Sequence, residues 1–138
     1  MNAVSKYGPV VIAAAALILS LYEGGVFSPP DKDSPLAWDL NHGIVVEGYG
    51  TDEVTGEDYW LVCNSWSEMW GKSGYIRLRR IYPDTLDDPD TNCGFDETPF
   101  DGVDCQLNPD GSDIVPHKVK VCGTNGMLYD QIFPVGGY

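Results

Sequence analysis

Three residues near the middle of the chain have the chemistry of a nucleophilic site: His42, Cys63 and Asn64. An imidazole can exchange protons with a thiol, provided that an acceptor on its second nitrogen fixes the ring orientation and the tautomer. An asparagine amide supplies that acceptor without adding a negative charge, as in the Cys-His-Asn variant of the catalytic triad. By residue type alone His42 and Asn64 could form such a pair, although a lone histidine that follows an asparagine is usually structural.

Two predicted strands must bring His42 and Asn64 together. The β-branched run of Gly43–Gly50 predicts one strand, and "YWLVCNSW" predicts the returning strand. Between them "TDEVTGED" predicts a hairpin turn with Gly56 at its tip. Successive strand residues point to opposite faces, so a strand that turns Asn64 toward His42 turns Cys63 away from it. Cys63 is therefore not predicted to be the nucleophile.

The remaining patterns predict an α+β fold that is mainly antiparallel β with one short helix. Pro9–Ala13 favours a buried strand, and the Ala- and Leu-rich Ala14–Tyr22 favours the helix. Gly74–Arg80, "GYIRLRR", alternates apolar and basic residues as a half-buried strand does. Two later segments, "HKVKVCG" and "MLYDQIFPV", are shorter strand candidates.

Length and composition indicate one core and exclude two classes of partner. The chain has 138 residues, of which 43% are apolar, and a net charge of −13 from 8 basic and 21 acidic residues. That charge argues against binding to nucleic acid and to anionic membranes. The apolar run Pro9–Tyr22 is shorter than the roughly 20 residues of a membrane-spanning helix. It is interpreted as a core element, with a membrane-associated peptide as the weaker alternative, and no signal peptide pattern opens the chain.

The acidic, Pro-rich segment 81–118 is predicted to be a long insertion on the surface. Every charged residue in Ile81–Asp113 is Asp or Glu, a composition more typical of a solvated loop than of a ligand site. The stretch "NPDGSD" suggests calcium, but the ligand spacing of an EF-hand is absent, so no metal is predicted.

Three stretches together resemble the papain family of cysteine peptidases, specifically its cathepsin L-like branch. They are "NHGIVVEGYG", "YWLVCNSWSEMWGKSGYIR" and "GMLYDQIFP". They are similar to the family patterns D/N-H-[AG]-V…V-G-Y-G, W-x-[VI]-K-N-S-W-G-x-x-W-G-x-x-G-Y and C-G-I…Y-P, of which the second is long and highly specific. The resemblance implies that residues 1–138 form the papain-like C-terminal (right) lobe, a β-barrel-like sheet with one short helix and the insertion 81–118.

Carried over by position, the resemblance implies a role for each motif residue. His42 would be the catalytic histidine and Asn64 the residue that orients it. Trp66 would cover their hydrogen bond and exclude water from it, and Trp70 would line the leaving-group side of the cleft. The pocket for the second residue before the cleaved bond would be lined by Ala13, Leu40, Gly43 and Asp130. Asp130 would pair with a Lys or Arg of the substrate, or would simply face water.

The sequence departs from the family where the nucleophile should be. The C-G-[SA]-C-[WY] motif and the upstream glutamine of the oxyanion hole are absent. The chain is therefore expected to supply the His/Asn half of a cysteine-type endopeptidase and to be inactive alone. Because "MNAVSKYGPV" is similar to an internal segment of the family, Met1 is interpreted as an internal methionine. The expected partners are a peptide or protein substrate and a Cys-bearing N-terminal lobe, with no cofactor, in a lysosome, a vacuole or the extracellular space.

The cysteines depart from the family as well. The family disulfide would end near "SPPDKDSP" and at a cysteine in the region of Asn125, and neither position carries one here. A bridge among Cys93, Cys105 and Cys122 is predicted instead, because these residues lie where a disulfide would best compensate for a missing core. Disulfides favour an oxidising compartment.

A second class of function remains open from the sequence. The chain could be a non-catalytic interaction domain with a papain-like fold, or a truncated pseudo-peptidase. Such a domain would bind its partner through the apolar face that lies between the two lobes in the family.

Overall fold

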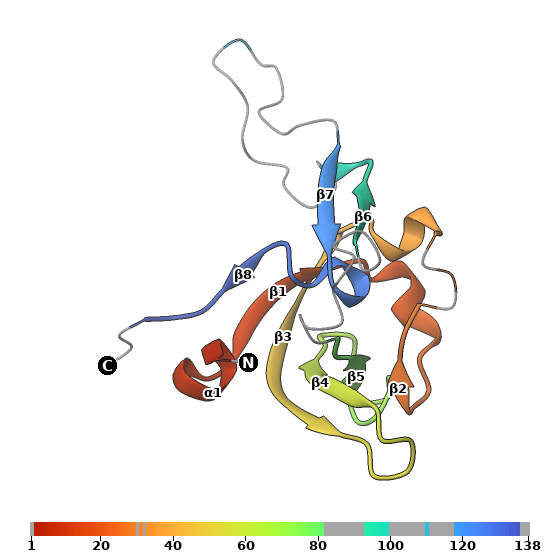
Figure 1. Ribbon diagram of the computed structural model, residues 1–138, viewed down its shortest axis with the longest axis vertical. Helices are drawn as coiled ribbons and strands as arrows, with labels where there is room; N and C mark the ends of the chain where they lie inside the picture. Colours follow the sequence, from red (N-terminus) through yellow and green to blue (C-terminus); the bar gives the residue numbers. More distant parts are fainter. Residues whose placement is uncertain are drawn as a thin grey trace.

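The computed structural model describes residues 2–29, 31, 33–81, 93–99, 110 and 118–135 (Figure 1). Its main sheet has six strands in the order β2-β5-β4-β3-β1-β8, and a separate two-stranded ribbon pairs β6 with β7. The strands are β1 Val10–Ala14, β2 Val26–Phe27, β3 His42–Thr51, β4 Asp58–Cys63, β5 Tyr75–Arg79, β6 Cys93–Asp96, β7 Val119–Cys122 and β8 Gln131–Ile132. The helices are α1 Asn2–Tyr7 and the 3₁₀ turns η1 Leu17–Leu21, η2 Pro35–Ala37 and η5 Thr124–Gly126.

The main sheet is open, so the expectation of a barrel-like sheet is wrong in this respect. Among the described residues, β2 and β8 are its two edges and do not pair with each other. Each edge strand is two residues long, too short to continue the ladder around a barrel. The sheet nevertheless curves strongly, because the long β3 bends past β4 and β5 (Figure 1). A register shift between Val46 and Gly48 lies in β3, and such a bulge bends a strand.

The hairpin between β3 and β4 is confirmed. Gly56 takes a φ of +74° in the turn and donates its N–H to the carbonyl oxygen of Asp52 at 2.8 Å. The Asp52 side chain accepts the N–H groups of Val54 and Thr55, each at 3.0 Å. These amides of Thr55 and Val54, and then the charge of Arg77, lower the pKa of Asp52 below its usual 3.8. The turn is therefore held by an ionised side chain as well as by a glycine.

The apolar run Pro9–Tyr22 is part of the core, as expected, but its second half is not an α-helix. After β1, the buried residues Ala16, Leu19 and Tyr22 recur every third position. That period matches the three residues per turn of the 3₁₀ helix η1. In the described part of the chain α1 is the single α-helix, and no described helix combines the length and apolar character needed to cross a membrane.

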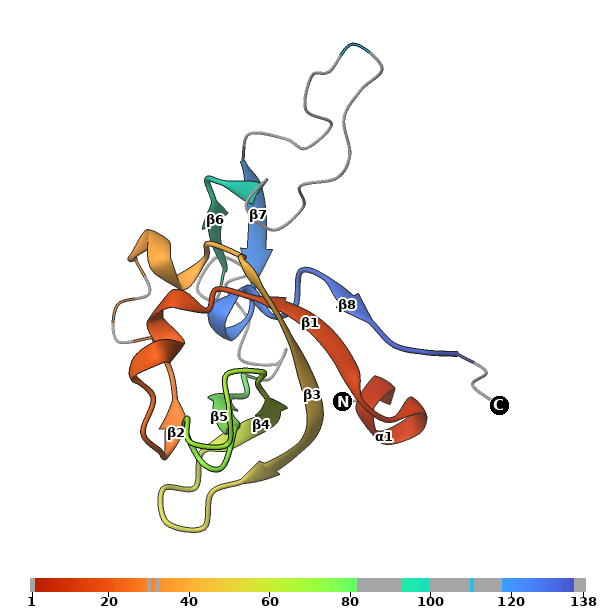
Figure 2. The ribbon, with the colours of Figure 1, turned by 180° about the vertical axis from the view of Figure 1, so that it is seen from behind.

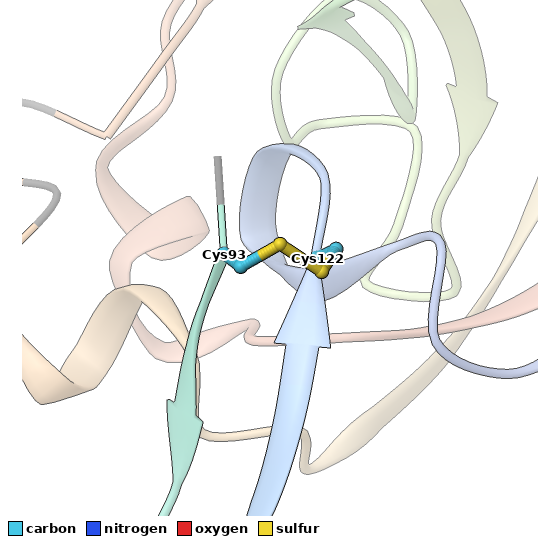
Figure 3. The surroundings of a disulfide bond; sticks show 2 residues. All are labelled: Cys93 and Cys122. Carbon is cyan, nitrogen blue, oxygen red and sulfur yellow. A yellow bond between two sulfur atoms is a disulfide. The ribbon is translucent and has the colours of Figure 1, made fainter. Parts of the chain in front are cut away.

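Within the acidic segment, Cys93–Asp96 form the strand β6. β6 pairs antiparallel with β7, and the ribbon stands beside one end of the main sheet (Figure 2). A disulfide between Cys93 and Cys122 joins the first residue of β6 to the last of β7 (Figure 3). This confirms the predicted bridge among three cysteines, of which Cys105 lies outside the described residues. The calcium-like stretch lies outside them too, apart from Asp110.

Candidate active site

The hairpin brings His42 and Asn64 into direct contact. His42 begins β3 and Asn64 follows β4, and the His42 Nε2 atom lies 2.9 Å from the Asn64 Oδ1 atom. The same oxygen accepts the N–H of Ser65 at 2.8 Å. A backbone N–H can only donate, so the atom that faces it must be the amide oxygen, and His42 must donate from Nε2. The neutral imidazole then keeps the lone pair on Nδ1 for a proton from another group.

One indole ring covers this pair, and a second packs against the first. Trp66 stacks on the His42 ring with the ring centroids 5.2 Å apart and the planes 23° apart. Trp70 packs edge-on against Trp66 at 5.1 Å and also lies 5.9 Å from the ring of Tyr22. Asn64 is only 8% exposed. The hydrogen bond between His42 and Asn64 is thus partly buried, and this lower exposure to water strengthens it electrostatically.

The loop that carries both tryptophans depends on two glycines with positive φ. Gly71 has a φ of +57°, and a side chain there would lie 2.6 Å from the carbonyl oxygen of Tyr75. Gly74 has a φ of +86°, donates its N–H to the carbonyl oxygen of Trp70 and accepts the N–H of Asn64 at 3.0 Å. Glycine adopts such angles with the least strain, although Ser67 and Ser73 of the same loop also have positive φ, +105° and +56°. The glycines of the tryptophan motif therefore fix the position from which Asn64 reaches His42.

A cavity of about 260 Å³ opens beside His42. It is lined by Val11, Ile12, Ala13, Leu40, Asn41, His42, Gly43, Asp130 and Ile132. The four residues assigned to the substrate pocket, Ala13, Leu40, Gly43 and Asp130, thus lie together. Ala13 pairs with Gly43 across β1 and β3, and its N–H bonds to the carbonyl oxygen of Asp130 at 3.3 Å. Leu40 is 6% exposed, whereas Asp130 is exposed.

Sequence reasoning missed several residues of this cavity. Val11 lies two positions before Ala13 on β1, so the two share a strand face, and Ile132 pairs with Val11 across β1 and β8. Strand alternation was the signal that could have identified Val11. Strand alternation does not identify Asn41. Its position is fixed by a tertiary contact, in which its Oδ1 accepts the N–H of Ala16 at 3.2 Å.

Cys63 contacts a different set of groups. It pairs with Val45 and Tyr75 across the neighbouring strands and keeps a free, half-buried thiol. The Tyr75 hydroxyl donates to Glu47 at 3.1 Å. This hydrogen bond, with the charges of Glu47 and Cys63, raises the pKa of Tyr75. Among the described residues, none of the hydrogen bonds of Cys63 involves His42.

The described residues therefore provide an imidazole oriented by an amide and a cavity beside it, but no thiol in contact with that imidazole. No group of three or more His, Cys, Asp or Glu side chains within the described ranges could hold a metal ion. A thiol brought to the free Nδ1 of His42 would complete a Cys-His-Asn site.

Comparison with known sequences agrees with this chemistry. Residues 1–102 match the family described as "Papain family cysteine protease". Cathepsin L of Sarcophaga peregrina is 48% identical over 81 residues, which are 57% of this chain and 23% of that protein. A cathepsin L-like peptidase of Aedes aegypti is 42% identical over 95 residues, covering 67% of this chain and 25% of that protein. The chain spans about a quarter of the length of these relatives.

Two solved structures share part of the fold. The bromelain protease from Ananas comosus superposes with a TM-score of 0.52 at 41% identity, covering 59% of this chain and 35% of that one. The digestive procathepsin L 3 of the Tenebrio molitor larval midgut superposes with a TM-score of 0.50 at 45% identity, covering 60% and 26%.

Proposed function

Because the chain belongs to the papain family of cysteine proteases, we propose that it supplies the His/Asn half of an endopeptidase site. His42 is the general base and acid, Asn64 orients it, and Trp66 shields their hydrogen bond. The single observation that supports this best is the 2.9 Å contact between Nε2 of His42 and Oδ1 of Asn64. With Nε2 donating, Nδ1 is the nitrogen available for a thiol.

The nucleophile in this proposal comes from a Cys-bearing N-terminal lobe, on the same polypeptide or on a separate one. Nδ1 of His42 takes the thiol proton, and the resulting imidazolium stabilises the thiolate. The thiolate attacks the peptide carbonyl carbon, and His42 returns the proton to the amine as the C–N bond breaks. Water then hydrolyses the thioester. Trp70 lines the leaving-group side.

The substrates we propose are peptides or proteins whose second residue before the cleaved bond enters the cavity beside His42. Ala13, Leu40 and Gly43 give that cavity an apolar wall. Asp130 also lines the cavity and is exposed, and at the pocket floor its carboxylate would favour a Lys or Arg. The Cys93–Cys122 disulfide supports an oxidising location, such as a lysosome, a vacuole or the extracellular space.

The test is turnover by a two-lobe protein in which this chain is combined with the Cys-bearing lobe of a papain-family relative. We expect hydrolysis of a fluorogenic dipeptide that stops with an epoxide thiol inhibitor. His42→Ala should abolish it, whereas His117→Ala, at the other histidine of the chain, should not. A folded two-lobe protein without turnover would refute the proposal.

A non-catalytic interaction domain is the second candidate, and the apolar rim of the cavity favours it. Val11 and Ile132 pair across β1 and β8, yet they are 43% and 62% exposed. Exposed apolar neighbours of this kind are typical of interaction surfaces. Tight association with a Cys-bearing lobe, without any turnover, would favour this alternative.

A further inference from the structure

The backbone of Leu40, two residues before His42, is hydrogen-bonded to the β6–β7 ribbon. Its N–H donates to Oδ2 of Asp96 at 3.2 Å, and Oδ1 of Asp96 accepts the N–H of Thr98 at 2.9 Å. Asp96 is only 1% exposed. A carboxylate this buried is stable only when its oxygens are hydrogen-bonded, and here one oxygen binds the segment that leads into the site.

The residues on either side of Leu40 are tied to the same ribbon. The Thr98 hydroxyl donates to Oδ1 of Asp39 at 3.0 Å, and Oδ2 of Asp39 accepts from the Asn41 side chain at 3.1 Å. The Asp39 side chain, and through it the Asn41 side chain, is therefore linked to the turn that follows β6, while the Leu40 backbone is bonded to β6 itself.

The side chain of Leu40 is fixed by β7 and by the turn that follows it. Leu40 belongs to a buried cluster that includes Val121 of β7 and Trp38. Gly126, in η5, lies so close that an added Cβ would be 2.5 Å from a methyl carbon of Leu40. Both the backbone and the side chain of this wall of the cavity are thus held by residues that follow position 92.

We propose that Asp96 is a positioning residue that fixes Leu40 and thereby the apolar wall of the cavity beside His42. The inference rests on the proposed function in one respect, namely that this cavity receives the substrate. A carboxylate is needed because it accepts two N–H donors at once. The amide of an asparagine would turn its NH₂ group toward one of these N–H groups.

Amide hydrogen exchange tests the proposal without any catalysis. In Asp96→Asn we expect exchange at Leu40 to become about tenfold faster, as for the loss of one hydrogen bond to a charged group. Exchange at Val62, in the core of the main sheet, should not change. The matched control is Glu97→Gln, which removes the same charge from the adjacent residue, whose side chain is 57% exposed. That variant should leave Leu40 unchanged.

Kinetics in the two-lobe protein separate positioning from general stability. Asp96→Asn should raise KM for a substrate with Phe at the second position before the cleaved bond by about tenfold. The kcat value should stay within about twofold, because His42 and Asn64 are untouched. If the two-lobe protein is inactive, the proposed function fails, and the exchange at Leu40 still decides the role of Asp96.

Two results would overturn the inference. One is unchanged exchange at Leu40 in folded Asp96→Asn, and the other is an equal increase at Leu40 and Val62, which would indicate only global destabilisation. If Asp96→Asn does not fold, Asp96→Glu replaces it. That variant keeps the charge but displaces the carboxylate from the N–H of Leu40, and it must speed exchange at Leu40 for the proposal to stand.

Discussion

The amide oxygen of Asn64 decides which nitrogen of His42 carries the proton. It accepts from Ser65 and from His42 at once, so the amide cannot rotate without turning its NH₂ group toward two donors. The imidazole is thereby fixed in the tautomer that leaves Nδ1 free. A buried environment under Trp66 makes this choice stronger than it would be in water.

Replacing Asn64 by Ala should release the ring. We expect the ¹⁵N chemical shifts of the His42 imidazole to change from a single tautomer with Nε2 protonated to a mixture of both. In the two-lobe protein kcat/KM should fall by roughly 10²-fold or more, since a general base that is not oriented loses most of its effect. Identical imidazole shifts in the parent and the variant would contradict the assigned role.

The contact between His42 and Asn64 was predictable from the sequence because a short turn forces two adjacent strands together. The β-branched residues of β3 and the glycine in the turn favour antiparallel pairing of β3 with β4. This pairing brings Asn64 beside His42. The contribution of Asp96 was not predictable. It lies in an acidic, Pro-rich segment whose composition indicates a solvated loop, and only the tertiary structure shows that it meets Leu40.

At the scale of elements, the β3–β4 turn contains a pH-sensitive contact. The pKa of Asp52 is lower in the folded protein than its unfolded value of 3.8. The ionised Asp52 side chain therefore stabilises the fold fully at pH values above the unfolded pKa. This stabilisation is lost as the pH falls through the folded pKa. Asp52→Asn keeps a side-chain oxygen for the turn but removes the charge. The variant should be less stable at neutral pH, and the difference should vanish in acid.

Urea unfolding between about pH 6 and pH 2 measures this effect. The parent should lose more stability than Asp52→Asn across the acid range. Glu53→Gln, at the exposed neighbouring position, is the control and should follow the parent. Parallel profiles for the parent and Asp52→Asn would show that the charge of Asp52 does not stabilise the turn.

The contact between β6 and the end of η2 is a second element-scale feature. A Cβ at Gly94 would lie 2.3 Å from the indole ring of Trp38, so Gly94→Ala should lower the free energy of unfolding by about 1–3 kcal/mol through overpacking. Gly24→Ala is the control, because nothing lies within 4 Å of the position that its added methyl group would take, and it should change stability by less than about 0.5 kcal/mol. Chemical denaturation measures both, and equal effects would contradict the packing argument.

Local patterns predicted the elements unevenly. β1, β3, β4 and β5 have β-branched or alternating residues over five or more positions. β1, β3 and β5 were expected close to their observed bounds, whereas β4 was expected to include "NSW" and ends at Cys63. The segment Ala14–Tyr22 was expected as a helix because Ala and Leu favour one, but the spacing of its buried residues selected a 3₁₀ turn. β2 and β6 are too short, and β6 lies in too acidic a segment, for any sequence period to show.

At the scale of the whole molecule, a disulfide links two segments that are distant in sequence, β6 and β7. The bridge between Cys93 and Cys122 spans a sequence separation of 29. Cys93→Ser combined with Cys122→Ser should lower the free energy of unfolding by about 3–4 kcal/mol, mainly by freeing the unfolded chain. Calorimetry under non-reducing conditions measures this loss. Cys63→Ser is the control, since that thiol is free, and an equal loss in it would contradict the account.

The most direct measurement of the central claim is labelling of the partner's thiol by an irreversible epoxide inhibitor, followed by mass spectrometry. The Cys-bearing lobe of a papain-family relative would be treated alone, with this chain, and with its His42→Ala variant. The account predicts rapid labelling of the catalytic cysteine only with the parent chain, because His42, oriented by Asn64, ionises the thiol. Equal labelling rates with the parent and with His42→Ala, in complexes of equal stability, would contradict it.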